Sequence, residues 1–201
     1  MDQTQLTTLQ EQYHDYFIIE HAIRINVSGF TSATEPDEAT FETMIPEPFR
    51  MAGELATLDK SALKSLNKLG ELAEELANYL RIQAKKIDSM MRYVLLQQDD
   101  PASRFITQAY GGSALCYLAP APRQPGELIE VKLFLAENDG AVYCLARVLS
   151  ADPVAEGFLI KATYSCIREQ DRELIVRASL HQQSRMLKRK AELRAQQQEQ
   201  P

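Results

Sequence analysis

The chain has 201 residues, of which 45% are hydrophobic and 25% are charged. These shares match ordinary globular proteins, so a packed core is expected and wholesale disorder is excluded. The formal net charge of -6 at pH 7 argues against a general nucleic-acid-binding or membrane-surface protein.

Targeting signals and cysteine usage favour a cytoplasmic protein without membrane insertion. No stretch approaches the ~18 apolar residues of a membrane-spanning helix, and residues 1–4 lack the basic start of a signal peptide. Cys116, Cys144 and Cys166 are widely spaced and outside any CxxC pair, so we expect reduced thiols. The histidines lie far from them in sequence, so no metal site is expected.

The N-terminal segment has the alternating pattern of a half-buried strand. Ile19, Ile23, Ile25 and Val27 alternate with polar or small neighbours. Residues 28–48 are rich in Thr, Glu and Pro, which predicts a loop or linker. Residues 1–48 are therefore expected to form a strand or helix segment followed by an acidic linker.

Residues 49–100 are predicted to form one long helix with a heptad repeat. Ten positions recur at alternating spacings of four and three, and we call them the seam: Ala62, Leu66, Leu69, Ala73, Leu76, Leu80, Gln83, Ile87, Met90 and Val94. An ordinary amphipathic helix drifts away from a strict heptad over this length, so the pattern indicates a coiled coil. Asp99-Asp100-Pro101 ends the helix, because proline cannot continue it.

The length of this helix favours self-assembly. From about Leu55 to Gln98 it would run ~65 Å, whereas a barrel of ~100 residues is only about 30 Å across. An intramolecular helical hairpin is the alternative, but the sequence shows no second long seam. The oligomerisation residues are thus expected to be Leu66, Leu69, Leu76, Leu80, Ile87, Met90 and Val94. Gln83 either sets register and partner number or is simply tolerated.

After Pro101 the hydrophobic period changes to two, which predicts strands. We expect them at residues 104–109, 113–118, 129–135, 142–148 and 158–166, with hairpin turns at Asn138-Asp139-Gly140 and at Asp152-Pro153 to Gly157. Cys144 and Cys166 share the inward parity of their strands. A helix follows from about Glu169 and runs into a Gln-rich tail at residues 196–201. Short antiparallel strands at this spacing predict a small barrel or sandwich in residues 101–201.

Several stretches together carry a family resemblance. They are residues 13–17 (YHDYF) leading into 23–27 (IRINV), residues 85–91 (KKIDSMM), the strand pair 110–117, and residues 171–177 (DRELIVR). With them the chain resembles the atypical, oligomerising, coiled-coil-containing branch of the PilZ family, whose six-stranded barrels are associated with the messenger cyclic di-GMP. The resemblance implies an α+β fold with a small antiparallel barrel of about six strands, a long central coiled-coil helix and a C-terminal helix. It also implies a four-stranded parallel coiled coil, hence a tetramer, and a place in cyclic di-GMP signalling.

The ligand motifs of ordinary PilZ domains are degenerate here. These domains bind the dinucleotide with RxxxR before the first barrel strand and D/NxSxxG after it. Arg104 precedes that strand, but Asp100 stands four residues earlier, and residues 109–114 retain only Ser113 as a hydroxyl. Arg168 and Arg172 form an RxxxR at the wrong end of the barrel. Guanidinium groups suit phosphates and guanine edges, so the candidate ligand residues are Arg104, Ser113 and, from a neighbouring subunit, Arg92.

Three functions remain open at this point. The chain is a PilZ-like adaptor that acts through a signalling protein partner, a cyclic di-GMP receptor with a non-standard site, or a coiled-coil scaffold with a β-barrel head and no nucleotide ligand. Catalysis is not expected, because Gly111-Gly112-Ser113 does not have the GxSxG spacing of a nucleophile elbow. No cofactor is expected, and an isolated barrel of residues 101–183 is predicted to bind cyclic di-GMP weakly or not at all.

Overall fold

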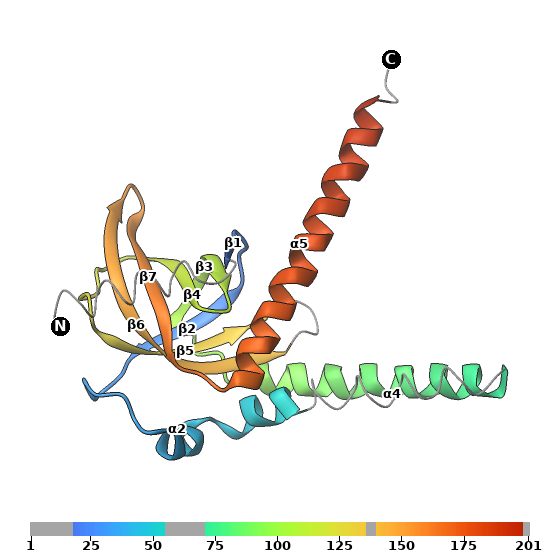
Figure 1. The fold of residues 1–201 in the computed structure, drawn as a ribbon, viewed down its shortest axis with the longest axis horizontal. Helices are drawn as coiled ribbons and strands as arrows, with labels where there is room; N and C mark the ends of the chain where they lie inside the picture. The colour runs from blue at the N-terminus through green and yellow to red at the C-terminus, as the bar shows by residue number, and fades with distance from the viewer. Residues whose placement is uncertain (1–17, 55–70, 136–139, 199–201) are drawn as a thin grey trace.

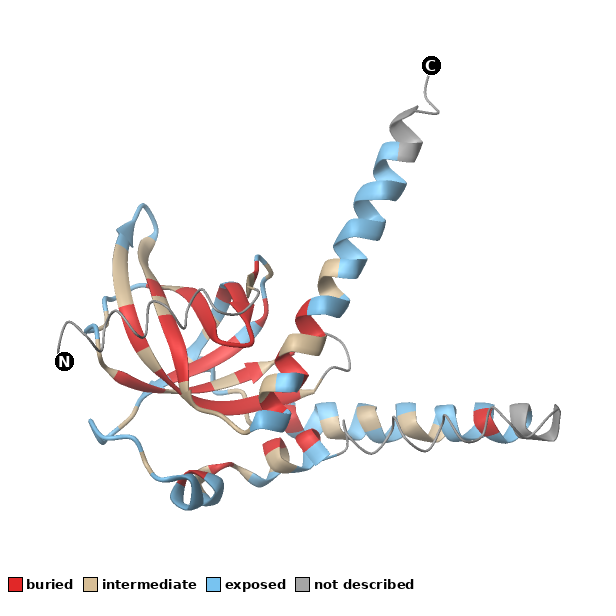
Figure 2. Cartoon of the chain, in the orientation of Figure 1, coloured by how far each residue is buried: buried red, intermediate tan, exposed pale blue. Residues whose placement is uncertain are grey.

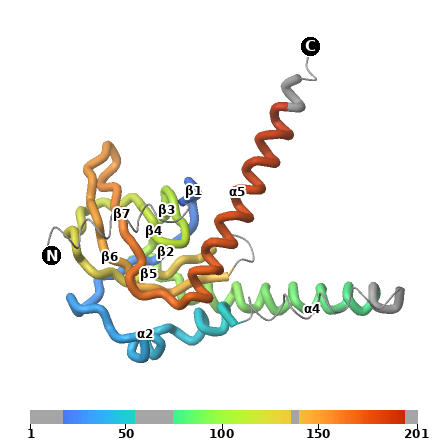
Figure 3. The backbone as a smooth tube through the Cα atoms, in the orientation of Figure 1, coloured from blue at the N-terminus to red at the C-terminus, as the bar shows by residue number. Residues whose placement is uncertain are grey.

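A computed structural model of the chain describes residues 18–54, 71–135 and 140–198. A β-barrel forms the body, and two long helices leave it in different directions (Figures 1 and 3). The strands are β1 (Ile18–Ile19), β2 (Arg24–Gly29), β3 (Arg104–Gly111), β4 (Ala114–Ala119), β5 (Leu128–Phe134), β6 (Ala141–Val154) and β7 (Gly157–Cys166). The helices are α2 (Glu38–Met44), α4 (Glu71–Leu96), α5 (Glu169–Gln198), a 3-10 turn at Pro101–Ser103 and a helix at residues 47–54.

Among the described residues, six antiparallel strands close into a barrel. The strand order is β3-β2-β5-β6-β7-β4, and pairing between β4 and β3 closes the ring, while β1 extends β3. The predicted fold class is confirmed. One strand comes from an unexpected place, because β2 of the N-terminal segment pairs with both β3 and β5. A fragment of residues 101–183 therefore lacks a barrel strand, and ligand binding has to be tested on the whole chain.

The barrel interior is filled by the inward rows of its strands and by the first turns of α5. The inward side chains include Ile25, Val27, Leu115, Tyr117, Val131, Leu133, Val142, Cys144, Ile160 and Ala162. Leu174, Ile175 and Ala178 of α5 belong to the same buried cluster, so the root of α5 plugs one end of the barrel. Figure 2 shows this change from buried to exposed along α5.

A second buried cluster lies on the outer face of β5 and β6, and it corrects the expected linker at residues 28–48. Asp37 accepts a hydrogen bond from the Thr40 amide (2.7 Å) and starts α2. Phe41 and Ile45 lie four residues apart, so both face the sheet, and Phe49 of the 47–54 helix joins them. Two apolar residues four positions apart after an N-capping Asp are a sequence signal for a short helix. The high Thr, Glu and Pro content of residues 28–48 obscured this signal.

Two further expectations about β6 and β7 are wrong in detail. Asp152 and Pro153 lie within β6, and the turn follows them, with Gly157 at φ 134°. Pro153 is tolerated because the pairing of β6 with β5 ends at Arg147, so Pro153 lies in a part of β6 that pairs only with β7. Cys166 is only half-buried and packs against the outer cluster, because Ser165 is an extra residue in β7 that reverses the side-chain alternation.

Helix α4 docks on the barrel through its last turns and then projects away from it (Figure 1). Leu95 is buried in the outer cluster and Met91 packs against it. The helix ends at Leu96, shortly before Asp99-Asp100-Pro101, as predicted. The expected single helix over residues 49–100 is wrong at its start, because residues 47–54 form a helix of their own whose Phe49 and Ala52 share the outer cluster with Leu95. One straight helix would separate residues 49 and 95 by roughly 69 Å at about 1.5 Å per residue. The seam positions Ala62, Leu66 and Leu69 lie outside the described residues. None of the helices in the described part of the chain is both long and apolar enough to cross a bilayer.

Candidate functional site

Arg104, the first candidate ligand residue, is held by a carboxylate of its own chain. Its Nε donates to Oδ1 of Asp99 (3.0 Å), and its Nη2 lies 3.0 Å from Oδ2 of the same group. This is the two-pronged arrangement in which a guanidinium also binds a phosphate. The Asp99 side chain is 3% exposed, and that of Arg104 is 41% exposed.

Arg24 and Asn26, which were not expected at the site, complete the cluster around Asp99. Arg24 Nη1 donates to Asp99 Oδ2 (2.9 Å), and Asn26 Nδ2 donates to Asp99 Oδ1 (3.0 Å). Asn26 also bonds both the amide (2.9 Å) and the carbonyl (3.1 Å) of Asp100. We call Arg24, Asn26, Asp99 and Arg104 the rim cluster. It joins β2 and β3 to the segment that follows α4.

The electrostatics of the rim cluster favour an ionised Asp99. Burial acts to raise the pKa of its carboxyl group. Hydrogen bonds from Arg104 and Asn26 and the positive charges of Arg104 and Arg24 outweigh burial, so the pKa lies below its ordinary value. Asp99 was interpreted from sequence only as part of a helix stop. Its partnership with Arg24 depends on β2 lying beside β3, and no local pattern gives that pairing.

The structure does not bring Ser113 to Arg104. Ser113 follows β3 at the far end of that strand, and the seven residue steps from Arg104 to Gly111 span roughly 23 Å at about 3.3 Å per residue. Ser113 is buried, and its carbonyl accepts the Tyr164 amide (2.9 Å). Ser113 and Arg104 therefore do not form one ligand site within a chain.

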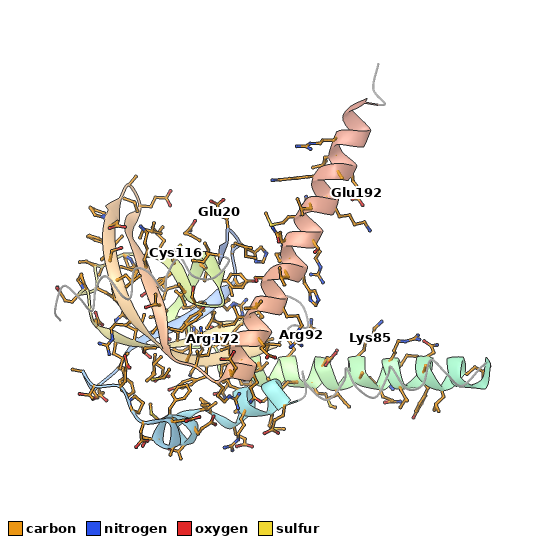
Figure 4. All side chains as sticks on the ribbon, in the orientation of Figure 1. Glu20, Lys85, Arg92, Cys116, Arg172 and Glu192 are labelled. Atoms are coloured by element: carbon orange, nitrogen blue, oxygen red, sulfur yellow. The ribbon has the colours of Figure 1, made fainter. Side chains whose placement is uncertain are left out.

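Arg92, the third candidate, is exposed on α4 about one turn before the helix ends (Figure 4). It belongs to the helix that projects from the barrel, whereas Arg104 and Ser113 belong to the barrel itself. The three predicted ligand residues thus occupy three separate places in the described structure.

The Arg168 and Arg172 pair has a structural role at the root of α5. Arg168 forms a two-pronged bond to Asp171 (2.7 and 3.0 Å), and the two side chains are 8% and 0% exposed. Arg172 donates to the Gly112 carbonyl (2.6 Å) and so fixes the β3–β4 turn. A Cβ on Gly53 would lie 3.0 Å from both members of the Arg168–Asp171 pair, so the glycine makes room for that pair. The RxxxR spacing here reflects a helix anchor.

Five large apolar residues of the seam are exposed on α4 of the single chain. Leu76, Leu80, Ile87, Met90 and Val94 are 49%, 38%, 45%, 63% and 40% exposed. These fractions are high for large apolar side chains at strict heptad spacing. A partner that covered them would remove a continuous apolar surface from water.

The described residues contain no group of three or more His, Cys, Asp or Glu side chains placed to hold a metal ion. Burial raises the pKa of the Cys144 thiol well above its ordinary value, and its side chain is fully buried in the barrel core. An inert thiol is expected from such a position.

No protein-family model and no curated protein matches the sequence. Among solved structures, the chain is similar to a pathogenic protein from Xanthomonas campestris, described as a tetrameric PilZ domain self-assembled via an unusual helical bundle. The TM-score is 0.51 at 15% identity, over 92% of this chain and 99% of the other. The inhibitor of motility from Bacillus subtilis (MotI/DgrA) matches with a TM-score of 0.46 at 10% identity, over 86% of this chain and 52% of the other.

The first of these two likenesses carries the assignment. At such low identity it concerns the fold alone, and it covers the barrel together with the helical additions. It agrees with the closed barrel of six strands and with the long helix between β2 and β3. The chain therefore has a PilZ-like fold of the atypical, helix-extended kind that its sequence resembles.

Proposed function

We propose that this chain is a non-enzymatic PilZ-like signalling module that assembles through α4 and acts as an adaptor in cyclic di-GMP pathways. The exposed seam on α4 is the observation that carries the proposal, since Leu76, Leu80, Ile87, Met90 and Val94 need a partner surface. The tetrameric assembly described for the Xanthomonas campestris protein supports four chains as the number.

The adaptor role is favoured over the receptor role by the state of the candidate ligand residues. Arg104 is bonded to Asp99, Ser113 is buried far along β3, and Arg92 lies on α4. A dinucleotide with two phosphates draws its affinity from several charge-assisted contacts, each worth about 1.5–3 kcal/mol. Loss of two such contacts weakens binding by at least a hundredfold.

The first test is the mass of the full chain in solution. One chain has a mass of 22.7 kDa. Light scattering is expected to give at least three chains, with the tetramer favoured. A mass of one chain at all concentrations would contradict assembly through the seam.

The second test is calorimetric titration of the full chain with cyclic di-GMP. An adaptor is expected to show no binding at micromolar ligand. Micromolar binding that is lost in Arg104→Ala would instead establish the receptor. A pull-down of a specific protein partner then separates the adaptor from a scaffold without a role in signalling.

A further inference from the structure

The rim cluster has the chemistry of an anion site that is already filled. Two guanidinium groups, from Arg24 on β2 and Arg104 on β3, converge on the two oxygens of Asp99 at 2.9 to 3.0 Å. Carboxylate and phosphate share the oxygen spacing that a guanidinium recognises. With one carboxylate between two arginines, the cluster keeps one excess positive charge.

The exposure of the three side chains shows where an external ligand would meet the cluster. Asp99 is 3% exposed, whereas Arg24 and Arg104 are 43% and 41% exposed. Each guanidinium has five N–H donors, and the bonds to Asp99 use two of those on Arg104 and one on Arg24. The arginines therefore reach solvent on one side while they hold the buried carboxylate on the other.

We propose that Arg24 and Arg104 form a binding site for a phosphate-class anion and that Asp99 is its internal occupant, which blocks the site in the native chain. The inference goes beyond the adaptor role, and the class of ligand follows from the two guanidinium groups that converge on Asp99. A tethered ligand has an effective concentration of about millimolar or more, so an external phosphate must exceed this to compete. An Asp99 carboxylate that occupies the two rim arginines therefore predicts weak binding of external phosphate by the native chain.

Competition between Asp99 and an external anion would also affect the junction between α4 and the barrel. Asp99 follows the end of α4 by three residues, and its carboxylate ties that segment to β2 and β3. An anion that displaces Asp99 removes this tie. Asn26 still holds Asp100 through two hydrogen bonds, so the segment stays attached to the barrel. Anion binding would therefore loosen the junction between α4 and the barrel without releasing it.

The test compares full-length variants by calorimetric titration with inorganic pyrophosphate at one fixed salt concentration. Asp99→Ala empties the site, and Asp99→Asn removes the charge while it keeps the shape of the side chain. If Asp99→Ala does not fold, the result for Asp99→Asn is used in its place. Both are expected to bind pyrophosphate at least about tenfold more tightly than the native chain. The gain is expected to disappear when Arg104→Gln is added to Asp99→Asn.

Asp100→Asn is the matched control. It removes one negative charge from the adjacent residue, and Asp100 contacts Ala102 and Ser103 but neither arginine. An equal gain in Asp100→Asn, or no gain in a folded Asp99→Asn, would overturn the inference. Tight binding of cyclic di-GMP by the native chain would contradict the adaptor role, and the pyrophosphate comparison would still decide the role of Asp99.

Discussion

The two long helices of this protein differ in where their apolar side chains go. Helix α5 places Leu174, Ile175 and Ala178 in the barrel core and then continues outward with a mainly polar and basic surface. Helix α4 buries Leu95 near its end, and along the rest of its length large apolar side chains are exposed. In the described part of the chain they are Leu76, Tyr79, Leu80, Ile82, Ile87, Met90, Tyr93, Val94 and Leu96.

This difference separates a helix that stabilises the fold from a helix that offers a surface. The root of α5 completes the barrel, so its apolar residues are already used within one chain. The exposed face of α4 keeps its heptad order beyond the barrel, and coiled coils use such order to pair helices. Substitutions in the root of α5 should therefore affect stability, whereas substitutions in the exposed face of α4 should affect assembly.

The largest expected effect is the loss of assembly in Leu76→Asp with Leu80→Asp. Each change places a carboxylate in the seam, and an unpaired charge there costs several kcal/mol once it is covered by a partner. Light scattering should give a single chain of about 22.7 kDa. The chain itself should stay folded, because both side chains are exposed in the single chain.

Asn78→Asp with Ser89→Asp is the matched control for this prediction. The two residues are exposed on α4 and outside the seam, and the double variant adds the same charge. Its mass should remain that of the native assembly. An unchanged mass in the Leu76 and Leu80 variant would show that the assembly surface lies elsewhere.

The second effect is a large loss of stability on removing one partner of the ion pair at the root of α5. Arg168→Met leaves the Asp171 carboxylate buried without its counter-ion, which typically costs about 3–5 kcal/mol. Burial already raises the pKa of Asp171, despite the hydrogen bonds and charge of Arg168. The deficit should therefore shrink as the pH falls, because the carboxylate can take up a proton. Urea unfolding of the native chain and of Arg168→Met at two pH values measures the loss of stability and its decrease at the lower pH. A stability of Arg168→Met equal to that of the native chain would contradict the role of the ion pair.

The third effect compares two leucines of the same helix. Leu174→Ala removes a buried side chain from the plug of the barrel and should cost about 3 kcal/mol. Leu187 is 60% exposed on the projecting half of α5, so Leu187→Ala should change stability by less than about 0.5 kcal/mol. Thermal unfolding of the two variants checks the difference. Equal losses would mean that the outer half of α5 is also packed in the assembly.

The smallest effect concerns acid sensitivity at the end of α4. The pKa of Asp99 is lower in the folded state than its ordinary value, so the folded chain binds fewer protons there. Its contribution is present above the unfolded pKa of about 3.9 and is lost as the pH falls through the lower folded value. Asp99→Asn should cost about 1 kcal/mol near neutral pH and less near pH 3. A constant difference across this range would show that the Asp99 charge does not stabilise the fold.

Much of the architecture was predictable because it depends on local periodicity. The change from a heptad to an alternating pattern at Pro101 marked where α4 gives way to strands, and β3, β4, β5 and β7 lie close to their predicted positions. The expected linker failed, because α2 is short and is held by contacts of Phe41 and Ile45 with the distant strands β5 and β6. The prediction that Cys166 points inward was wrong, because an extra residue in β7 reverses the side-chain alternation before Cys166. That extra residue arises from how β7 pairs with β6, which the sequence of β7 alone does not show.

The sequence by itself determined the small barrel, the end of α4 before Asp99-Asp100-Pro101 and the loss of the usual ligand motifs, because each depends on the order and spacing of nearby residues. The role of the seam in assembly stays a prediction. The tertiary structure alone decided that β2 lies between β3 and β5. It also decided that Arg24 and Arg104 meet on Asp99, and that Ser113 lies far from Arg104. Closing a barrel brings residue 24 beside residue 106, and no local pattern along the chain encodes that contact.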